Sequence, residues 1–126
     1  AVCVFCTDCL SCICYHESGC KPLGCKQDNG TLSCGYFQIK EPYYIDAGQP
    51  GKRHGESTEV AWKRCADDFQ CAATCVQNYV RRYASNCGGV GKCQRISRLH
   101  NGGPHGCNET ATLGYWRVIE NCCRCS

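Results

Sequence analysis

The sequence predicts a small, disulfide-rich, mainly helical α+β domain with one short antiparallel hairpin sheet. Its 126 residues fit a single domain, residues 1–126, with a core of limited size. Seventeen of the 126 residues are cysteine. This share of the chain is well above the roughly 8–10% that marks a disulfide scaffold in a short secreted protein. Turn-forming residues gather between positions 21 and 57, whereas helical patterns dominate afterwards. These observations favour stapled helices packed around a small sheet.

The cysteines also predict where the protein works. Thiols in a reducing cytosol stay reduced, so a framework this dense indicates a secreted, extracellular protein. The chain begins at Ala1 without a basic and then apolar leader, and we expect it to be a mature form. No apolar run is long enough for membrane insertion. Zinc binding at the C-x-x-C spacings is the alternative to disulfides, but secreted cysteines normally pair, so we expect neither a metal nor a cofactor.

The odd number of cysteines and the charge bear on partners. At least one thiol must be free, bound to something else or paired between chains. A bridge between chains would make a homodimer, which the sequence leaves open. The net charge of +3 helps an approach to an anionic surface, but it is too weak to predict a nucleic-acid partner.

The first elements follow from spacing and turn residues. Cysteines at 9, 12 and 14 favour a helix with sulfurs along one face, and Gly19 is its expected end. Asn29-Gly30 is a strong hairpin signal. The segments 31–34 and 36–39 beside it are rich in residues that favour extended structure. Residues 41–57, with two prolines and three glycines, look like a loop.

Helices are expected after this loop. The aspartates at 67–68 can cap a long helix that runs to about Tyr83. A shorter helix over 93–100 is stopped by the Asn-Gly-Gly-Pro run that follows it. The last helix covers 110–121, with one of its first threonines as the cap.

Two acidic side chains are candidates for chemistry. Glu17 lies at the predicted helix end and Asp28 on the turn that enters the hairpin. A glycosidase needs two carboxylates facing one cleft, one as a protonated acid and the other ionised. The alternative is that both are solvated surface carboxylates, as most acidic residues are.

Aromatic and amide side chains around the hairpin are suited to contact a sugar. Sugar rings stack on aromatic faces and hydrogen-bond to amides such as those of Gln38 and Asn101. The alternative is that the aromatic residues fill the core and that His100 satisfies carbonyls at a helix end. The aromatic candidates are Tyr36, Phe37, Tyr43 and Tyr44.

Longer motifs carry a family resemblance. Cys-Leu-Ser-Cys-Ile-Cys at 9–14 is followed by Glu-Ser-Gly-Cys at 17–20 and by Gln-Asp-Asn-Gly-Thr-Leu-Ser-Cys-Gly-Tyr-Phe-Gln-Ile-Lys at 27–40. The chain resembles the invertebrate-type (i-type) lysozymes, the family that includes destabilase. The match continues in the same order as far as Cys122, through the segments 42–46, 75–79, 82–83, 100–104 and 114–116.

The resemblance implies a muramidase, which hydrolyses the β-1,4 bond between N-acetylmuramic acid and N-acetylglucosamine, for antibacterial defence, digestion of bacteria or both. The family glutamate falls on Glu17, as general acid, and the family aspartate on Asp28, as nucleophile or electrostatic stabiliser. Such an acid calls for an apolar, partly desolvated pocket that keeps Glu17 protonated near neutral pH. The implied partners are bacterial peptidoglycan and chitin oligosaccharides. The implied substrate-binding residues are Tyr36, Gln38, Lys40, Tyr43, His100, Asn101 and Gly103.

Two alternatives to the muramidase stay open. Some family members look like isopeptidases that cleave γ-glutamyl–lysine crosslinks, and the residues proposed for that activity fall on Ser33, Lys40 and His100. A serine beside a base is the minimum for acyl transfer, but the same residues are also read as a strand position, a surface charge and a sugar contact. The other alternative is a non-catalytic binder of chitin or peptidoglycan, which would need neither carboxylate.

The sequence departs from the family pattern at Ala47, where the family usually has a cysteine. The partner of that cysteine is then left unpaired; the sequence does not identify it, and Cys75 is one candidate. Four further cysteines look additional to the common set, and we expect them to tie the termini together or to the body: Cys3, Cys6, Cys123 and Cys125.

Two glycosylation sequons occur, beginning at Asn29 and Asn108. The first adjoins Asp28, so a glycan there would crowd the expected sugar cleft. We therefore predict that Asn29 is unmodified in active protein.

Overall fold

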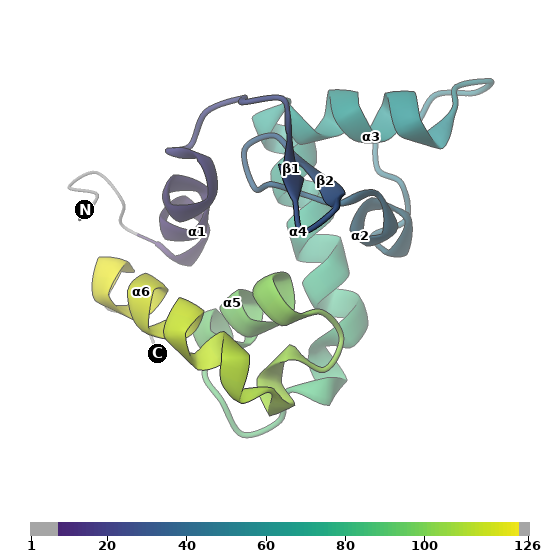
Figure 1. The fold of residues 1–126 in the computed structure, drawn as a ribbon. Helices are drawn as coiled ribbons and strands as arrows, with labels where there is room; N and C mark the ends of the chain where they lie inside the picture. Colours follow the sequence, from purple (N-terminus) through teal and green to yellow (C-terminus); the bar gives the residue numbers. More distant parts are fainter. Residues whose placement is uncertain (1–7, 124–126) are drawn as a thin grey trace.

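The computed structural model describes residues 8–123 (Figure 1). The helices within this range are α1 (Cys9–Ser18), α2 (Glu41–Asp46), α3 (Thr58–Ala66), α4 (Phe69–Tyr83), α5 (Lys92–Gly102) and α6 (Leu113–Cys123). The strands are β1 (Cys25–Asp28) and β2 (Thr31–Cys34), paired antiparallel. Figure 1 shows α4 passing behind the hairpin and α5 beside α6. The expected disulfide-rich, mainly helical α+β fold with one hairpin sheet is confirmed.

Helix α1 has clear signals at both ends. Asp8 and Ser11 form a reciprocal capping box, in which the Asp8 carboxylate accepts from the Ser11 N–H at 2.8 Å. Gly19 ends the helix in the left-handed conformation, with φ 71°, as expected. This boundary places Glu17 in the last turn of the helix.

The hairpin confirms the turn predicted at Asn29-Gly30. Asp28 pairs with Thr31 across the turn, and Asn29 and Gly30 both have positive φ, as the tightest hairpin turns require. The expectation of extended structure over 36–39 is wrong, because the turn Gly35–Gln38 interrupts it and only Ile39 forms a bridge, to Cys34. The same turn buries the Phe37 side chain completely.

The expected loop over 41–57 is also wrong in its first part. Residues Glu41–Asp46 form α2, which begins after an extended Lys40. Pro42 favours a loop in the sequence, but it lies in the first turn of α2, where a proline lacks only an N–H that has no helical partner. The rest of the segment is irregular, and the Arg64 guanidinium holds it by contacts to Glu56 and the Gly51 carbonyl.

The later helices follow the predicted order with small shifts. Helix α4 starts after Asp68, whose side chain accepts from the Cys71 N–H at 3.0 Å, and runs to Tyr83 as expected. Helix α5 is longer than expected and extends to Gly102. The last helix begins only at Leu113, because Thr110–Thr112 forms a separate 3₁₀ turn. Thr112 does not cap it, since its buried hydroxyl accepts from Arg98 and donates to backbone carbonyls.

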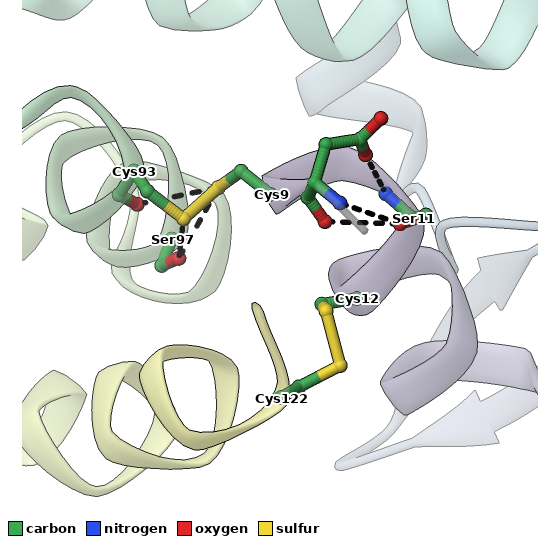
Figure 2. The surroundings of a disulfide bond; sticks show 7 residues. Cys9, Ser11, Cys12, Cys93, Ser97 and Cys122 are labelled. Carbon is green, nitrogen blue, oxygen red and sulfur yellow. Dashed lines mark hydrogen bonds between the residues drawn. A yellow bond between two sulfur atoms is a disulfide. The ribbon is translucent and has the colours of Figure 1, made fainter. Parts of the chain in front are cut away.

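Disulfides join the helices that are far apart in the chain. Cys9–Cys93 ties α1 to α5, and Cys12–Cys122 ties α1 to α6 (Figure 2). The other bridges within the described residues are Cys14–Cys20, Cys25–Cys34, Cys65–Cys71 and Cys87–Cys107. The predicted ties made by Cys3, Cys6, Cys123 and Cys125 involve side chains outside the described part of the chain.

Cys75 is a free, buried thiol on α4. The adjoining end of α2 lies close by, because Asn78, one helical turn after Cys75, donates to the Ala47 carbonyl at 3.1 Å. Ala47 is itself buried. The expectation that Cys75 is left unpaired opposite an alanine is therefore confirmed within residues 8–123.

Candidate active site

Glu17 projects from the end of α1 into a polar contact with two other helices. Its Oε2 atom accepts a hydrogen bond from the Tyr115 hydroxyl of α6 at 2.8 Å. The Nε2 atom of His100, in the last turn of α5, lies 3.4 Å from the same oxygen. The Glu17 side chain is only 21% exposed. The acid therefore lies where three helices meet.

The pKa of Glu17 is set by opposing effects. Burial of the carboxylate raises the pKa, but hydrogen bonding and charge from His100, with a further hydrogen bond from Tyr115, outweigh burial and lower it below the usual value. The expectation of an apolar pocket that keeps Glu17 protonated near neutral pH is therefore wrong for the unliganded protein. The cause is that donors, not only apolar groups, surround the buried oxygen.

His100 joins four parts of the fold. Its Nδ1 atom lies 2.8 Å from the Tyr43 hydroxyl of α2, and its Nε2 atom lies 3.0 Å from the Phe37 carbonyl. The imidazole side chain is only 4% exposed. In the neutral tautomer with a proton on Nε2, His100 donates to Phe37 and accepts from Tyr43, which satisfies both ring nitrogens. His100 thus does more than satisfy carbonyls at the end of its own helix.

Asp28 lies in a second, more open cluster. Its side chain is 56% exposed, and Oδ2 lies 3.1 Å from the Lys40 ammonium. Lys40 also donates to the hydroxyls of Thr31 at 2.8 Å and Ser33 at 2.9 Å. The Ser33 hydroxyl in turn donates to Asp28 Oδ2 at 3.4 Å.

The two clusters are linked through the start of α2. Lys40 holds Asp28, and one turn later Tyr43 holds His100, which faces Glu17. The structure therefore brings Glu17, His100 and Tyr43 together, and separately Asp28, Ser33 and Lys40. Among residues 8–123, no hydrogen bond or ion pair joins His100 to Ser33.

The remaining predicted sugar-binding residues lie around these clusters. Tyr36 is half-buried and packs edge-on against Phe69, with ring centroids 5.4 Å apart. The Gln38 amide donates to the Gly35 carbonyl at 3.0 Å, so the turn already uses one of its donors. Asn101 is exposed at the end of α5, and Gly103 follows with φ 83°.

The two other aromatic candidates belong to the core. Phe37 and Tyr44 are almost completely buried, which decides for core filling at these two positions. Tyr43 remains half-buried and stacks on Tyr79, with ring centroids 3.7 Å apart. Tyr43 is therefore the aromatic candidate that is connected to Glu17, because His100 contacts both residues.

Tyr115 is the site residue that sequence reasoning missed. It lies in a segment that carries the family resemblance, but no local pattern connects it with Glu17, because 98 positions separate the two residues. The only signal was the presence of an aromatic residue with a polar tip in a helix expected to pack on the core. Such residues usually find a hydrogen-bond partner when buried.

The described part of the chain holds no cluster of three or more metal-ligating side chains. None of the helices between residues 8 and 123 is both long and apolar enough to cross a membrane.

Comparison with known proteins gives one consistent family. The family model described as Destabilase matches residues 6–122. Invertebrate-type lysozyme 2 of Caenorhabditis elegans is 64% identical over 94% of this chain and 87% of its own length. The lysozyme of Meretrix lusoria is 51% identical over 93% of this chain and 89% of its own length. The crystal structure of Tapes japonica lysozyme superposes with a TM-score of 0.79 at 48% identity, covering 94% of this chain and 90% of that one.

Proposed function

Since the chain belongs to the destabilase family of invertebrate-type lysozymes, it is a glycoside hydrolase of the lysozyme type, and we propose that Glu17 and Asp28 are its two catalytic carboxylates. Its relatives are named lysozymes at 51–64% identity over most of the chain, so the alternative of a non-catalytic binder is not supported. Its substrate is bacterial peptidoglycan.

The observation that carries the proposal is the contrast between the two carboxylates. Glu17 is mostly buried and touches a phenol and an imidazole. Asp28 is mostly exposed and pairs with an ammonium. A glycosidase needs one carboxyl group that gives up a proton and one that stays charged, and unlike surroundings are how a protein separates these roles.

Glu17 is the proton donor in this proposal. In the unliganded protein its pKa is lowered, mainly because His100 and Tyr115 oppose the effect of burial. A sugar that covers the exposed fifth of the side chain would strengthen the effect of burial, which favours the protonated form. Substrate binding therefore favours the protonated form of Glu17, which can transfer its proton to the glycosidic oxygen.

Asp28 is the charged partner. Lys40 and Ser33 fix its Oδ2 atom, and none of the described residues forms a hydrogen bond or ion pair with Oδ1. That oxygen is the one available to stabilise positive charge on the sugar ring or to attack its anomeric carbon. Asp28 is thus the more open of the two carboxylates, and the Lys40 ammonium lies 3.1 Å from its Oδ2 atom.

We further propose that the protein acts outside the cell. Within the described residues six disulfides hold the fold, and such a framework persists only in an oxidising compartment. The proposed substrate, the peptidoglycan of bacterial cell walls, lies in the same compartment.

The proposal is tested by the release of reducing sugar ends from purified peptidoglycan. Glu17→Gln and Asp28→Asn keep the shape of each side chain, and we expect each to lower kcat by at least about 100-fold. Glu120→Gln is the matched control, because Glu120 is an exposed carboxylate on α6, and it should leave the rate unchanged. Parent-like activity in Glu17→Gln would overturn its assignment as the acid.

One contact supports an isopeptidase as a second candidate function. Lys40 Nζ lies 2.9 Å from Ser33 Oγ, a spacing that suits a serine nucleophile and a lysine base. In this arrangement, however, Lys40 is also paired with Asp28 and donates to Ser33. Cleavage of a γ-glutamyl–lysine substrate that is lost in Ser33→Ala would establish this activity, and no cleavage by the parent protein would exclude it.

A further inference from the structure

The hydrogen bond between Tyr115 and Glu17 joins two helices that are far apart in the chain. Helix α1 and helix α6 run antiparallel, because Cys12 is bonded to Cys122 while Glu17, later in α1, meets Tyr115, earlier in α6. Figure 2 shows the disulfide between the two helices. A covalent tie thus lies between about one and two helical turns from the hydrogen bond and limits how far the two helices can slide.

The Tyr115 side chain is itself held in place. Its ring packs edge-on against His16 of α1, with centroids 5.1 Å apart and planes at 83°. Its hydroxyl is a permanent donor, because burial and the neighbouring Glu17 carboxylate raise the pKa of the phenol well above its usual value. A phenol that keeps its proton has one hydrogen to donate, and in this contact it donates it to Glu17 Oε2.

The hydrogen bond distinguishes the two oxygens of Glu17. Oε2 accepts from the Tyr115 hydroxyl and faces His100 Nε2, whereas Oε1 forms no hydrogen bond or ion pair with any described residue. When Glu17 is protonated, a proton on Oε2 would compete with the Tyr115 donor for the same position. The proton is therefore best placed on Oε1, which can turn toward a substrate.

We propose that Tyr115 is a positioning residue for the reaction, which reserves Oε2 of Glu17 and so directs the transferable proton to Oε1. This inference rests on the proposed role of Glu17 as the acid. Tyr115 acts through Glu17 and needs no contact with the sugar. It also supplies a donor that favours the ionised carboxylate, so it helps to set the pH at which the acid loses its proton.

Several groups face Glu17, and the test must separate Tyr115 from them. His100 of α5 and His16 of α1 both favour the ionised carboxylate, and the Tyr43 hydroxyl of α2 lies beyond His100. All three remain unchanged when only the Tyr115 hydroxyl is removed. Tyr115→Phe is therefore the informative variant, since it keeps the ring that packs on His16.

The experiment measures kcat and KM on purified peptidoglycan across the pH range for the parent, Tyr115→Phe and Tyr15→Phe. Tyr15 is a half-buried tyrosine on α1 whose hydroxyl makes no hydrogen bond to any described residue, and it serves as the matched control. We expect Tyr115→Phe to lower kcat about tenfold with KM unchanged, because the acid loses its fixed orientation. The basic limb of the profile should move to higher pH, because the ionised form of Glu17 loses a donor.

The outcomes separate this inference from the proposed function. If Glu17→Gln stays active, the proposed role of Glu17 has failed. If Glu17→Gln is inactive but Tyr115→Phe keeps the parent basic limb, or moves it no more than Tyr15→Phe does, only the inference about Tyr115 is overturned. A purely structural role would lower kcat without moving the limb.

A second variant keeps the test open if Tyr115→Phe folds poorly. Site-specific incorporation of 3,5-difluorotyrosine at position 115 retains the ring and hydroxyl but makes the phenol a stronger donor. The basic limb should then move to lower pH, opposite to its movement in Tyr115→Phe. An unmoved limb in the fluorinated protein would contradict the inference.

Discussion

At the scale of single residues, Cys75 differs from the other buried cysteines described here because it has no sulfur partner. Its thiol is packed in the core on α4, at 0% exposure. Burial raises the pKa of the thiol to about 12, because a thiolate would be desolvated there. The thiolate is the reactive species, so this cysteine should be chemically silent in the folded protein.

The first prediction follows from that burial. Iodoacetamide at pH 8 should leave Cys75 unmodified in the native protein and modify it once the chain is unfolded in denaturant without reductant. Peptide mass spectrometry measures the modified fraction, with a small free thiol in the same solution as the control for reagent activity. Rapid native labelling of Cys75 would show that α4 opens far more readily than its packing implies.

Individual site residues were predictable to different degrees. Glu17, Asp28 and His100 could be named from motifs, because each stands in a long segment of family-like sequence. The direction of the Glu17 pKa could not, since it depends on His100 and Tyr115, which only the folded chain brings to the carboxylate. A motif identifies a residue, whereas its protonation depends on neighbours from other helices.

At the scale of elements, the segments after the hairpin decide where the site forms. The turn at Gly35–Gln38 and helix α2 place the Phe37 carbonyl and Tyr43 against His100. The turn and the helix both differ from the structure that the sequence predicts there, and for the same reason. Glycine and proline mark a change of direction, but only packing decides whether the next residues form a strand, a turn or a short helix.

Gly35 is the position at which this path is most constrained. Its φ is +76°, and a Cβ atom there would lie 1.8 Å from the Ala66 carbonyl oxygen of α3. Tyr36 N–H donates to that same oxygen at 3.0 Å. The close approach of backbone to backbone therefore requires glycine.

The second prediction compares two glycines of similar conformation. Gly48→Ala meets nothing within 4 Å at φ +87°, so it should cost about 1–2 kcal/mol of unfolding free energy from backbone strain alone. Gly35→Ala adds the clash with Ala66 and should cost about 4 kcal/mol or more, a loss reserved for severe steric defects. Denaturant unfolding measures both, and equal losses would mean that the Gly35 backbone relaxes away from α3.

At the scale of the whole molecule, the candidate site has no local origin. Its residues come from α1, the hairpin, α2, α5 and α6, and disulfides with sequence separations of 84 and 110 connect α1 to α5 and to α6. The sequence predicted the fold class from cysteine content and turn residues, but it left the pairing open, because spacing alone does not determine connectivity. The pairing is what places α1, and with it Glu17, against α5 and α6.

The last prediction tests that role of the disulfides. Cys12–Cys122 and Cys87–Cys107 each pair a fully buried sulfur with a half-buried one, but they close loops of different length, with separations of 110 and 20. Replacing both cysteines of a bridge by alanine should therefore cost about 1.5 kcal/mol more for Cys12–Cys122, from the greater freedom of its unfolded chain. Only that variant should lower kcat when both proteins are assayed well below their melting temperatures, because α1 then retains a single long-range tie in the described part of the chain. Thermal unfolding and reducing-end release measure the two effects. If kcat is unchanged without Cys12–Cys122, the packing of α1 on α6 and the Glu17–Tyr115 hydrogen bond suffice to hold the acid, and the disulfide contributes stability alone.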